Sequence, residues 1–352
     1  MRALAPLCRL FRLALLVMSA LALVGCATGP LPELDWRDPA VDQVWPSPPE
    51  TARLRYLRSL TGVGDFEGDS KGSRLFRWVT GEKKQGMPLV SPFAVAADGN
   101  GRVWVTDPGT GLINSFDLGR RRVEYWGQAG DQPFVSPAGI GFDPQQGTLY
   151  VSDPGLNKVF ALDLDGELRG AFEPPGGFGR PAGLAVDASG SVYVADVLKG
   201  VVHVFNGRGE HQGALGSLLA ATGRFNRPTG VALGRDGSVF VLDTMNFKVE
   251  VQNPDGTLVG GIGGSGDVPG ALARPRGVAV DSEGHLYVSD AAFDNLQIFS
   301  REGQLLLFVG GNGDAPGFFN LPAGMFIDRQ DHLYVVDSLN RRVQIFQYLA
   351  ER

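Results

Sequence analysis

Four arginines are notable for where they lie relative to recurring prolines. Arg180, Arg227 and Arg274 are spaced 47 residues apart and each directly precedes a proline, while Arg276 directly follows the last of these prolines. The planar guanidinium group of arginine binds carboxylate and phosphate groups through paired hydrogen bonds. Brought together by the fold, these four side chains would form a basic crescent that attracts anions.

Aspartates recur at two positions with a similar spacing, so a ring of carboxylates is the second arrangement to consider. The position that we call the corner aspartate follows an apolar run in six copies, at Asp107, Asp153, Asp196, Asp243, Asp290 and Asp337. Another aspartate lies at the first expected turn of five copies, at Asp98, Asp143, Asp187, Asp281 and Asp328. Aspartate side chains at such places bond to nearby backbone groups and cap turns. We therefore interpret both sets as architecture.

The histidines do not form the pattern of a metal site. His203, His285 and His332 align with positions that are simply polar in the other copies, and His211 lies in a glycine-rich turn. A zinc site needs three or four converging ligands. The sequence therefore predicts no catalytic residue, no metal and no other cofactor.

Six copies of one unit must position these residues. Each copy begins with Pro-x-Gly or a close variant, runs apolar to a turn, and runs apolar again to the corner aspartate. The opening prolines are Pro92, Pro137, Pro181, Pro228, Pro275 and Pro322, at steps of 45, 44, 47, 47 and 47 residues. Two further β-rich runs complete each period, and four short runs per period of about 47 residues are typical of a propeller blade.

The pattern resembles the NHL repeat family of β-propellers over residues 53–348. This resemblance implies an all-β, six-bladed β-propeller with four-stranded blades. The chain ends after the third strand of the sixth copy, and Arg53–Leu60 alternates polar and apolar residues as an edge strand does. We predict that this N-terminal strand pairs with the last blade and closes the ring, with a free N-terminal hairpin as the alternative.

In a propeller of this type the x residue of Pro-x-Gly faces the mouth of the central channel. The x residues are Phe93, Ala138, Ala182, Thr229, Arg276 and Ala323. The gluconolactonase-like propellers, which this architecture also resembles, place metal-binding Asn and Asp there, and this sequence has neither. A calcium-type lactonase site consequently lacks its hard oxygen ligands.

The candidate site for a ligand or partner is therefore the arginine crescent, together with Phe93 and Thr229 at the same mouth. The simpler interpretation, which we favour on the sequence, is that the arginines form an ion-pair ladder with the corner aspartates of their blades. The candidates for that ladder are Asp196, Asp243 and Asp290.

The N-terminus indicates export and lipidation. Leu13–Val24 is an apolar run of 12 residues after a basic start, which suits a signal peptide and is too short to span a bilayer. It leads into Leu23-Val24-Gly25-Cys26, which resembles a bacterial lipobox, so we expect acylation, with palmitate among the acyl chains, at Cys26. The other cysteine, Cys8, leaves with the signal peptide, so no disulfide is expected.

Three segments follow from these features: a signal peptide at 1–25, a proline-rich tether at 26–52 after the lipidated cysteine, and the propeller at 53–352. Within 61–90 an insertion contains Arg74–Gly81, which can form a short amphipathic helix. It is either a lid packed on the ring or a rim that binds a partner.

Charge and composition narrow the function. Residues 1–25 hold three arginines and no acid, which leaves 29 basic against 38 acidic side chains in the exported part. An excess of acid argues against nucleic acid as a partner. We predict a lipid-anchored scaffold or binding protein of the cell envelope, in the outer membrane of a Gram-negative source, that holds a protein partner or an anionic ligand. The alternative is a lyase or hydrolase like other NHL-like propellers.

Overall fold

The computed structural model describes residues 36–66, 86–216 and 225–350. They belong to one compact unit that spans Asp35–Arg352. The expected signal peptide, Cys26 and the helix expected at Arg74–Gly81 lie outside the described residues. Within the described ranges, no helix has the length and apolar character needed to cross a membrane.

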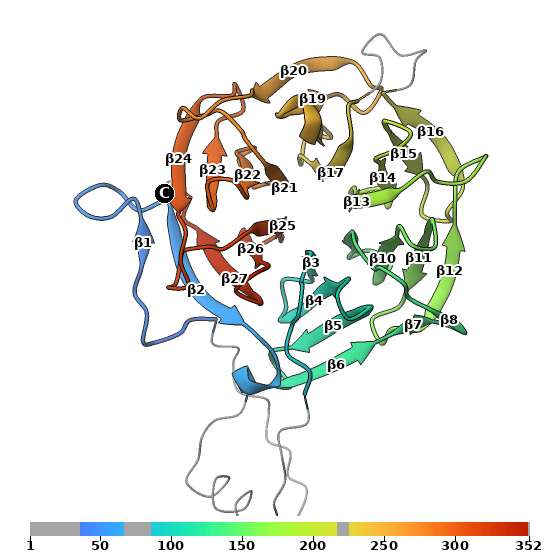
Figure 1. The fold of residues 1–352 in the computed structure, drawn as a ribbon, viewed down its shortest axis with the longest axis horizontal. Helices are drawn as coiled ribbons and strands as arrows, with labels where there is room; N and C mark the ends of the chain where they lie inside the picture. Colours follow the sequence, from blue (N-terminus) through green and yellow to red (C-terminus); the bar gives the residue numbers. More distant parts are fainter. Residues whose placement is uncertain (1–35, 67–85, 217–224, 351–352) are drawn as a thin grey trace, which may run out of the picture. The chain divides into compact units, whose positions relative to one another are not determined.

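Six antiparallel blades surround a central channel, as Figure 1 shows, which confirms the six-bladed all-β propeller. Five blades are continuous in sequence, and their strands run in chain order from the channel outward. The first blade contains β3 (Ala94–Ala97), β4 (Arg102–Asp107), β5 (Leu112–Asp117) and β6 (Arg122–Trp126). The second contains β9 (Ile140–Asp143), β10 (Thr148–Asp153), β11 (Lys158–Leu162) and β12 (Leu168–Phe172).

The next three blades repeat this plan. The third contains β13 (Pro181–Val186), β14 (Val192–Asp196), β15 (Val201–Phe205) and β16 (His211–Leu215). The fourth contains β17 (Pro228–Leu233), β18 (Val239–Asp243), β19 (Lys248–Gln252) and β20 (Leu258–Gly263). The fifth contains β21 (Pro275–Val280), β22 (Leu286–Asp290), β23 (Asn295–Phe299) and β24 (Leu305–Gly310).

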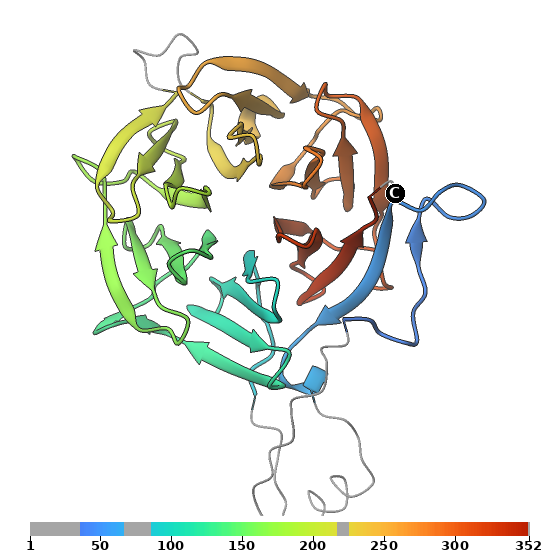
Figure 2. The ribbon, with the colours of Figure 1, turned by 180° about the vertical axis from the view of Figure 1, so that it is seen from behind.

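The sixth blade joins the two ends of the propeller. Its inner strands β25 (Pro322–Ile327), β26 (His332–Asp337) and β27 (Arg342–Tyr348) come from the C-terminal part of the chain. Its fourth strand is β2 (Leu54–Leu60), which pairs antiparallel with β27. Figure 2 shows this blue strand beside the red one. The predicted closure is confirmed, and it leaves β27 without an open edge.

Small elements connect or flank the blades. β7 (Gln128–Ala129) and β8 (Gln132–Pro133) form a hairpin between the first and second blades. Two 3-10 turns, η1 (Val63–Phe66) and η2 (Thr244–Asn246), follow β2 and β18.

The segment 36–52, which the sequence assigns to the tether, lies against the sixth blade instead of extending freely. Its strand β1 (Val44–Trp45) pairs with the start of β2, and Trp45 contacts Phe346 edge-on with ring centroids 5.8 Å apart. Trp36 stacks on His332 with ring centroids 4.4 Å apart. Burial of these large rings makes a segment packed on the sixth blade more stable than an extended one. The folded unit therefore begins before the predicted boundary at residue 53.

The apolar core lies between neighbouring blades. A blade inside the ring is covered on both faces, so its second strand is an unbroken apolar run rather than an alternating one. All six residues of β10 and of β26 are buried. The largest fully buried side chains include Trp104, Tyr150, Tyr287 and Tyr334, all of which come from second strands.

The corner aspartates tie each second strand to the loop that leads into the inner strand. All six are fully buried. Asp290 accepts hydrogen bonds from the backbone N–H groups of Ala273 (2.7 Å) and Arg274 (3.0 Å). Asp107, Asp153 and Asp196 bind two successive N–H groups in the same way, and Asp243 and Asp337 bind one. The interpretation of these aspartates as architecture is confirmed.

We expect Asp290→Ala to lower the free energy of unfolding by about 1–3 kcal/mol or more, because it leaves buried N–H groups without acceptors. Denaturant unfolding followed by fluorescence measures the change. Asp267→Ala is the control, since Asp267 is exposed. Equal stability of the two variants would contradict the role given to the corner aspartates.

Candidate functional site

The inner strands begin at one end of the channel, which we call the arginine mouth (Arg180, Arg227, Arg274 and Arg276). Their first residues touch around the ring. The carbonyl oxygen of Ala182 accepts a hydrogen bond from Ser152 Oγ of the preceding blade at 2.6 Å. A Cβ on Gly139 would lie 2.2 Å from that same oxygen, so the second copy needs glycine at the third position of Pro-x-Gly. The x residues are thereby held at the edge of the channel.

Arg276 and Phe93 meet at this mouth although they come from the fifth and first blades. The guanidinium carbon of Arg276 lies 5.5 Å from the centroid of the Phe93 ring, which is a cation–π contact. Burial lowers the pKa of Arg276, and the nearby positive charge of Arg274 lowers it further. Because arginine stays charged at neutral pH, a bound anion would stabilise these two neighbouring cations, of which Arg276 is half-buried and Arg274 is exposed.

The predicted ion-pair ladder is wrong for the residues that the structure describes. Arg180, Arg227 and Arg274 are exposed, and no described carboxylate forms an ion pair with their side chains. The reason is that the carboxylates expected to pair with them are fully buried and bonded elsewhere. Asp196, for example, accepts the backbone N–H of Arg180 at 2.9 Å and not its guanidinium group.

Thr229, the last of the predicted site residues, is held inside the fourth blade. Its hydroxyl shares a hydrogen bond with the hydroxyl of Thr244, which directly follows the second strand of that blade and begins η2. Arg227 precedes it by two residues and adopts a left-handed backbone conformation with φ of 64°. The loop therefore turns sharply just before the inner strand begins.

The histidines have partners that the sequence did not reveal. His285 Nδ1 lies 2.9 Å from Asp281, and His332 Nδ1 lies 2.9 Å from Asp328, so both hold aspartates of the first hairpins. His203 Nε2 lies 3.6 Å from Asp196. Across the described ranges, no group of three or more His, Cys, Asp or Glu side chains is placed to hold a metal ion.

His203 contributes to the electrostatics of the loop that carries Arg180. Burial alone would raise the pKa of Asp196. The neighbouring His203 and the backbone N–H groups of Gly179, Arg180 and Lys199 outweigh burial and lower that pKa to about 2. Gln344, at the equivalent place in the sixth blade, donates a hydrogen bond to Asp337 at 3.1 Å.

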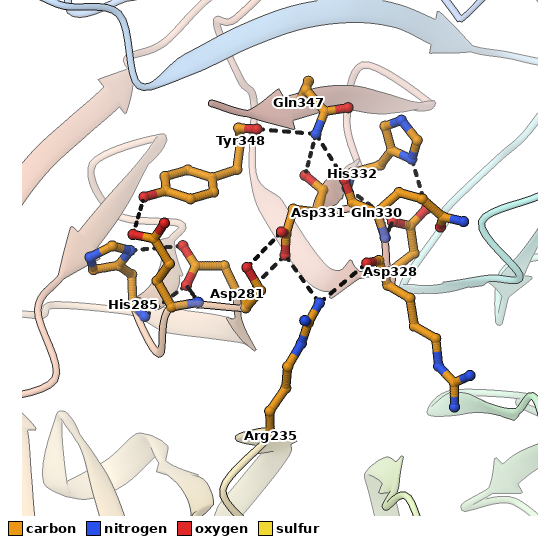
Figure 3. A network of polar contacts seen from close by, with 12 residues as sticks. Arg235, Asp281, His285, Asp328, Gln330, Asp331, His332, Gln347 and Tyr348 are labelled. Atoms are coloured by element: carbon orange, nitrogen blue, oxygen red, sulfur yellow. Dashed lines mark hydrogen bonds and ion pairs between the residues drawn. The ribbon is translucent and has the colours of Figure 1, made fainter. Parts of the chain in front are cut away.

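The opposite end of the channel, where the first hairpins lie, holds a connected polar network (Figure 3). Arg235 of the fourth blade reaches the sixth, where it lies 3.8 Å from Asp331 and donates to the carbonyl oxygen of Arg329 at 3.2 Å. Asp331 also accepts hydrogen bonds from the backbone N–H and hydroxyl of Ser282 at 3.0 and 2.7 Å. This network joins three consecutive blades.

A cavity of about 670 Å³ occupies this end of the channel. Apolar residues of the inner strands line its wall, and charged residues including Asp98, Asp187 and Arg235 line its rim. Sequence reasoning missed both the cavity and the bridge by Arg235. The available signal was Gly234, which replaces the first-turn aspartate in the fourth copy and is followed by that arginine. Since Arg235 and Asp331 pair with each other, the arginine mouth is the stronger candidate for binding.

Family comparisons agree with this architecture. The family described as SMP-30/Gluconolactonase/LRE-like region matches residues 73–217, and the NHL repeat matches residues 272–299. The chain is thus a six-bladed β-propeller whose fifth blade matches the NHL repeat. No curated protein matches the sequence.

Solved structures similar to this propeller include three enzymes. A streptogramin B lyase is 14% identical with a TM-score of 0.54, and the match covers 75% of this chain and 95% of that one. A gluconolactonase from Xanthomonas campestris is 17% identical with a TM-score of 0.56, covering 74% and 86%. The hydrazine synthase of Kuenenia stuttgartiensis is 12% identical with a TM-score of 0.54, covering 75% and 97%. At these identities the likeness shows the fold alone.

The pKa of Asp196 leads to a pH-dependent prediction for His203→Gln. In the folded chain this pKa is about 2, below its ordinary value of 3.8, so the carboxylate stabilises the fold above about pH 4 and this contribution is lost as the pH falls through about 2. The variant should raise the pKa in the folded chain, so the contribution should be smaller and its loss on acidification should be complete at a higher pH. Unfolding free energies measured across this acid range test the shift.

The control places His203→Gln in an Asp196→Asn background, where it should leave the pH profile unchanged. An unchanged profile in the wild-type background would contradict the role given to His203.

Proposed function

We propose that this NHL propeller is a lipid-anchored binding protein of the cell envelope that holds anionic groups of a ligand or partner at the arginine mouth. The observation that carries the proposal is that Arg180, Arg227 and Arg274 are exposed and lack a carboxylate partner among the described residues. Arg276 adds a fourth guanidinium group against Phe93. Four cations around one opening favour carboxylate or phosphate groups.

The net charge of the chain strengthens this argument. The whole chain carries a formal charge of −6, so a local excess of arginine is not a consequence of a basic composition. The carboxylates that could have neutralised the loops of the third and fifth blades, Asp196 and Asp290, bind backbone N–H groups instead. Electrostatic attraction of this kind mainly speeds association and gives specificity for anionic partners.

The anchor is supported by the sequence alone. Cys26 follows the apolar run Leu13–Val24 and the lipobox-like residues directly before it. Acylation at two or more sites anchors a protein far better than one chain, at about 0.8 kcal/mol per buried CH₂ group. The described propeller begins ten residues later, at Trp36.

A catalytic function is the second candidate, because the gluconolactonase-like family matches residues 73–217. This chain has Phe93, Ala138 and Ala182 at the x positions of its first three blades. None of these side chains can ligate a metal or transfer a proton. Lactone hydrolysis by the purified protein at a rate that depends on added calcium would favour this function over the binding role.

We expect Cys26→Ser to abolish incorporation of radiolabelled palmitate and to move the protein from the membrane to the soluble fraction. Circular dichroism should show an unchanged propeller, since the described fold begins after this residue. Equal labelling of the variant and the wild type would contradict lipidation at Cys26.

We expect the quadruple change of Arg180, Arg227, Arg274 and Arg276 to Ser to abolish capture of the partner. The assay is mild cross-linking in membranes, solubilisation and affinity capture. A matched control changes Arg120, Arg121, Arg122 and Arg208 to Ser, which removes the same charge from exposed positions elsewhere. Capture of the same partner by the mouth variant would contradict binding at the arginine mouth.

A further inference from the structure

Exposed apolar side chains surround the arginine mouth in five of the six blades, as far as the structure describes them. We call them the apolar ring, and they are Val90, Val135, Leu198, Met245 and Leu339. Between 45% and 66% of each side chain is exposed. All five lie in the loops that the corner aspartates organise, at the end of the channel where the inner strands begin.

The apolar ring follows from the repeat. In each blade two positions lie side by side. One is the residue two places before the opening proline, and the other is the residue two places after the corner aspartate. A Cβ on Gly155 would lie 2.5 Å from Val135 Cγ1, and a Cβ on Gly179 would lie 3.1 Å from Leu198 Cβ. In the first three blades the neighbour of the large residue is glycine, and in the fourth and sixth blades it is Asn226 and Asn320. Each of these five blades therefore presents a single large apolar side chain.

The apolar ring and the arginine mouth form one surface. Gly179, which contacts Leu198, directly precedes Arg180. In the fourth blade the backbone N–H of Met245 bonds to the carbonyl oxygen of Asn226, the residue before Arg227. Arginine and methionine are both enriched at protein interfaces, and exposed apolar side chains gathered on one surface mark a place where another protein can bind.

The extent and charge of this surface select its occupant. A small anion can contact the mouth but cannot cover side chains on five blades, and each apolar side chain gains about 25 cal/mol per Å² only when it is covered. The chain's own residues 67–85 contain five Lys or Arg against three Asp or Glu, so their net charge does not complement that of the arginines. A second copy placed face to face would oppose two identical basic mouths.

We propose that this surface docks a protein segment in which acidic side chains alternate with or flank apolar ones. The proposal rests on the proposed function, which it deepens by naming the chemistry of the partner. The carboxylates of the segment pair with Arg180 and Arg227, and its apolar side chains cover Leu198 and Met245. Binding therefore needs the apolar ring as well as the arginines.

The test selects peptides from a displayed random 16-residue library on the full mature chain in detergent micelles. Enriched sequences should combine Asp or Glu with large apolar residues. One of these peptides, labelled with a fluorophore, then reports affinity by anisotropy. Leu198→Ser/Met245→Ser should weaken its binding about tenfold or more, and Arg180→Ser/Arg227→Ser should weaken it and flatten its salt dependence.

Two controls keep the result specific. Leu258→Ser/Val259→Ser removes apolar side chains of comparable exposure from the outer strand β20 and should leave affinity unchanged. Leu198→Met/Met245→Leu conserves the apolar ring and should retain wild-type affinity, which separates loss of contact from loss of folding.

The outcomes distinguish this inference from the proposed function. Unchanged affinity of the Leu198→Ser/Met245→Ser protein, with loss only in the arginine variant, would overturn docking on the apolar ring and leave anion binding standing. Peptide affinity that is unchanged in both the Leu198→Ser/Met245→Ser and the Arg180→Ser/Arg227→Ser proteins would overturn the docking proposal. So would a selection that enriches no peptide on the wild type beyond what it enriches on the Leu198→Ser/Met245→Ser protein. Concentration-dependent dimerisation that buries the apolar ring would show that its occupant is a second copy.

Discussion

The buried carboxylate of the corner aspartate is the interaction on which the rest of this propeller depends. In each blade it joins the end of the second strand to one or two backbone N–H groups of a loop about 17 residues earlier in the sequence. That single contact fixes where the inner strand begins. Because a charged acceptor binds buried N–H groups strongly, the loop cannot move outward without leaving both the charge and its donors unsatisfied.

This arrangement separates the side chains that build the ring from those available to a partner. Asp196 and Asp290 are used by the backbone, so the guanidinium groups of Arg180 and Arg274 remain exposed beside them. At the other end of the channel the opposite holds, because Arg235 and Asp331 pair and join blades to each other. The two ends share one repeat and differ in that Arg180, Arg227 and Arg274 form no ion pair with a described carboxylate, whereas Arg235 pairs with Asp331.

The regular parts of the structure could be predicted from the sequence, and the irregular parts could not. The repeat predicted the blades, the role of the corner aspartates and the pairing of the N-terminal strand with β27, because each depends on a periodic pattern. The docking of Trp36 and Trp45 on the sixth blade was missed because proline-rich composition favours an extended segment while these aromatic rings favour burial. The ion-pair ladder failed because residue types and spacing do not reveal that backbone groups already occupy a carboxylate.

The central claim is that the guanidinium groups of the arginine mouth are free to bind anions. The most direct measurement records the ¹⁵N–¹H resonances of the arginine Nε–H groups while citrate is added. The account predicts that the signals of Arg180, Arg227, Arg274 and Arg276 shift together and saturate, while that of Arg122, paired with Glu124, stays in place. Signals at the mouth that do not respond, or respond no more than Arg122, would contradict it.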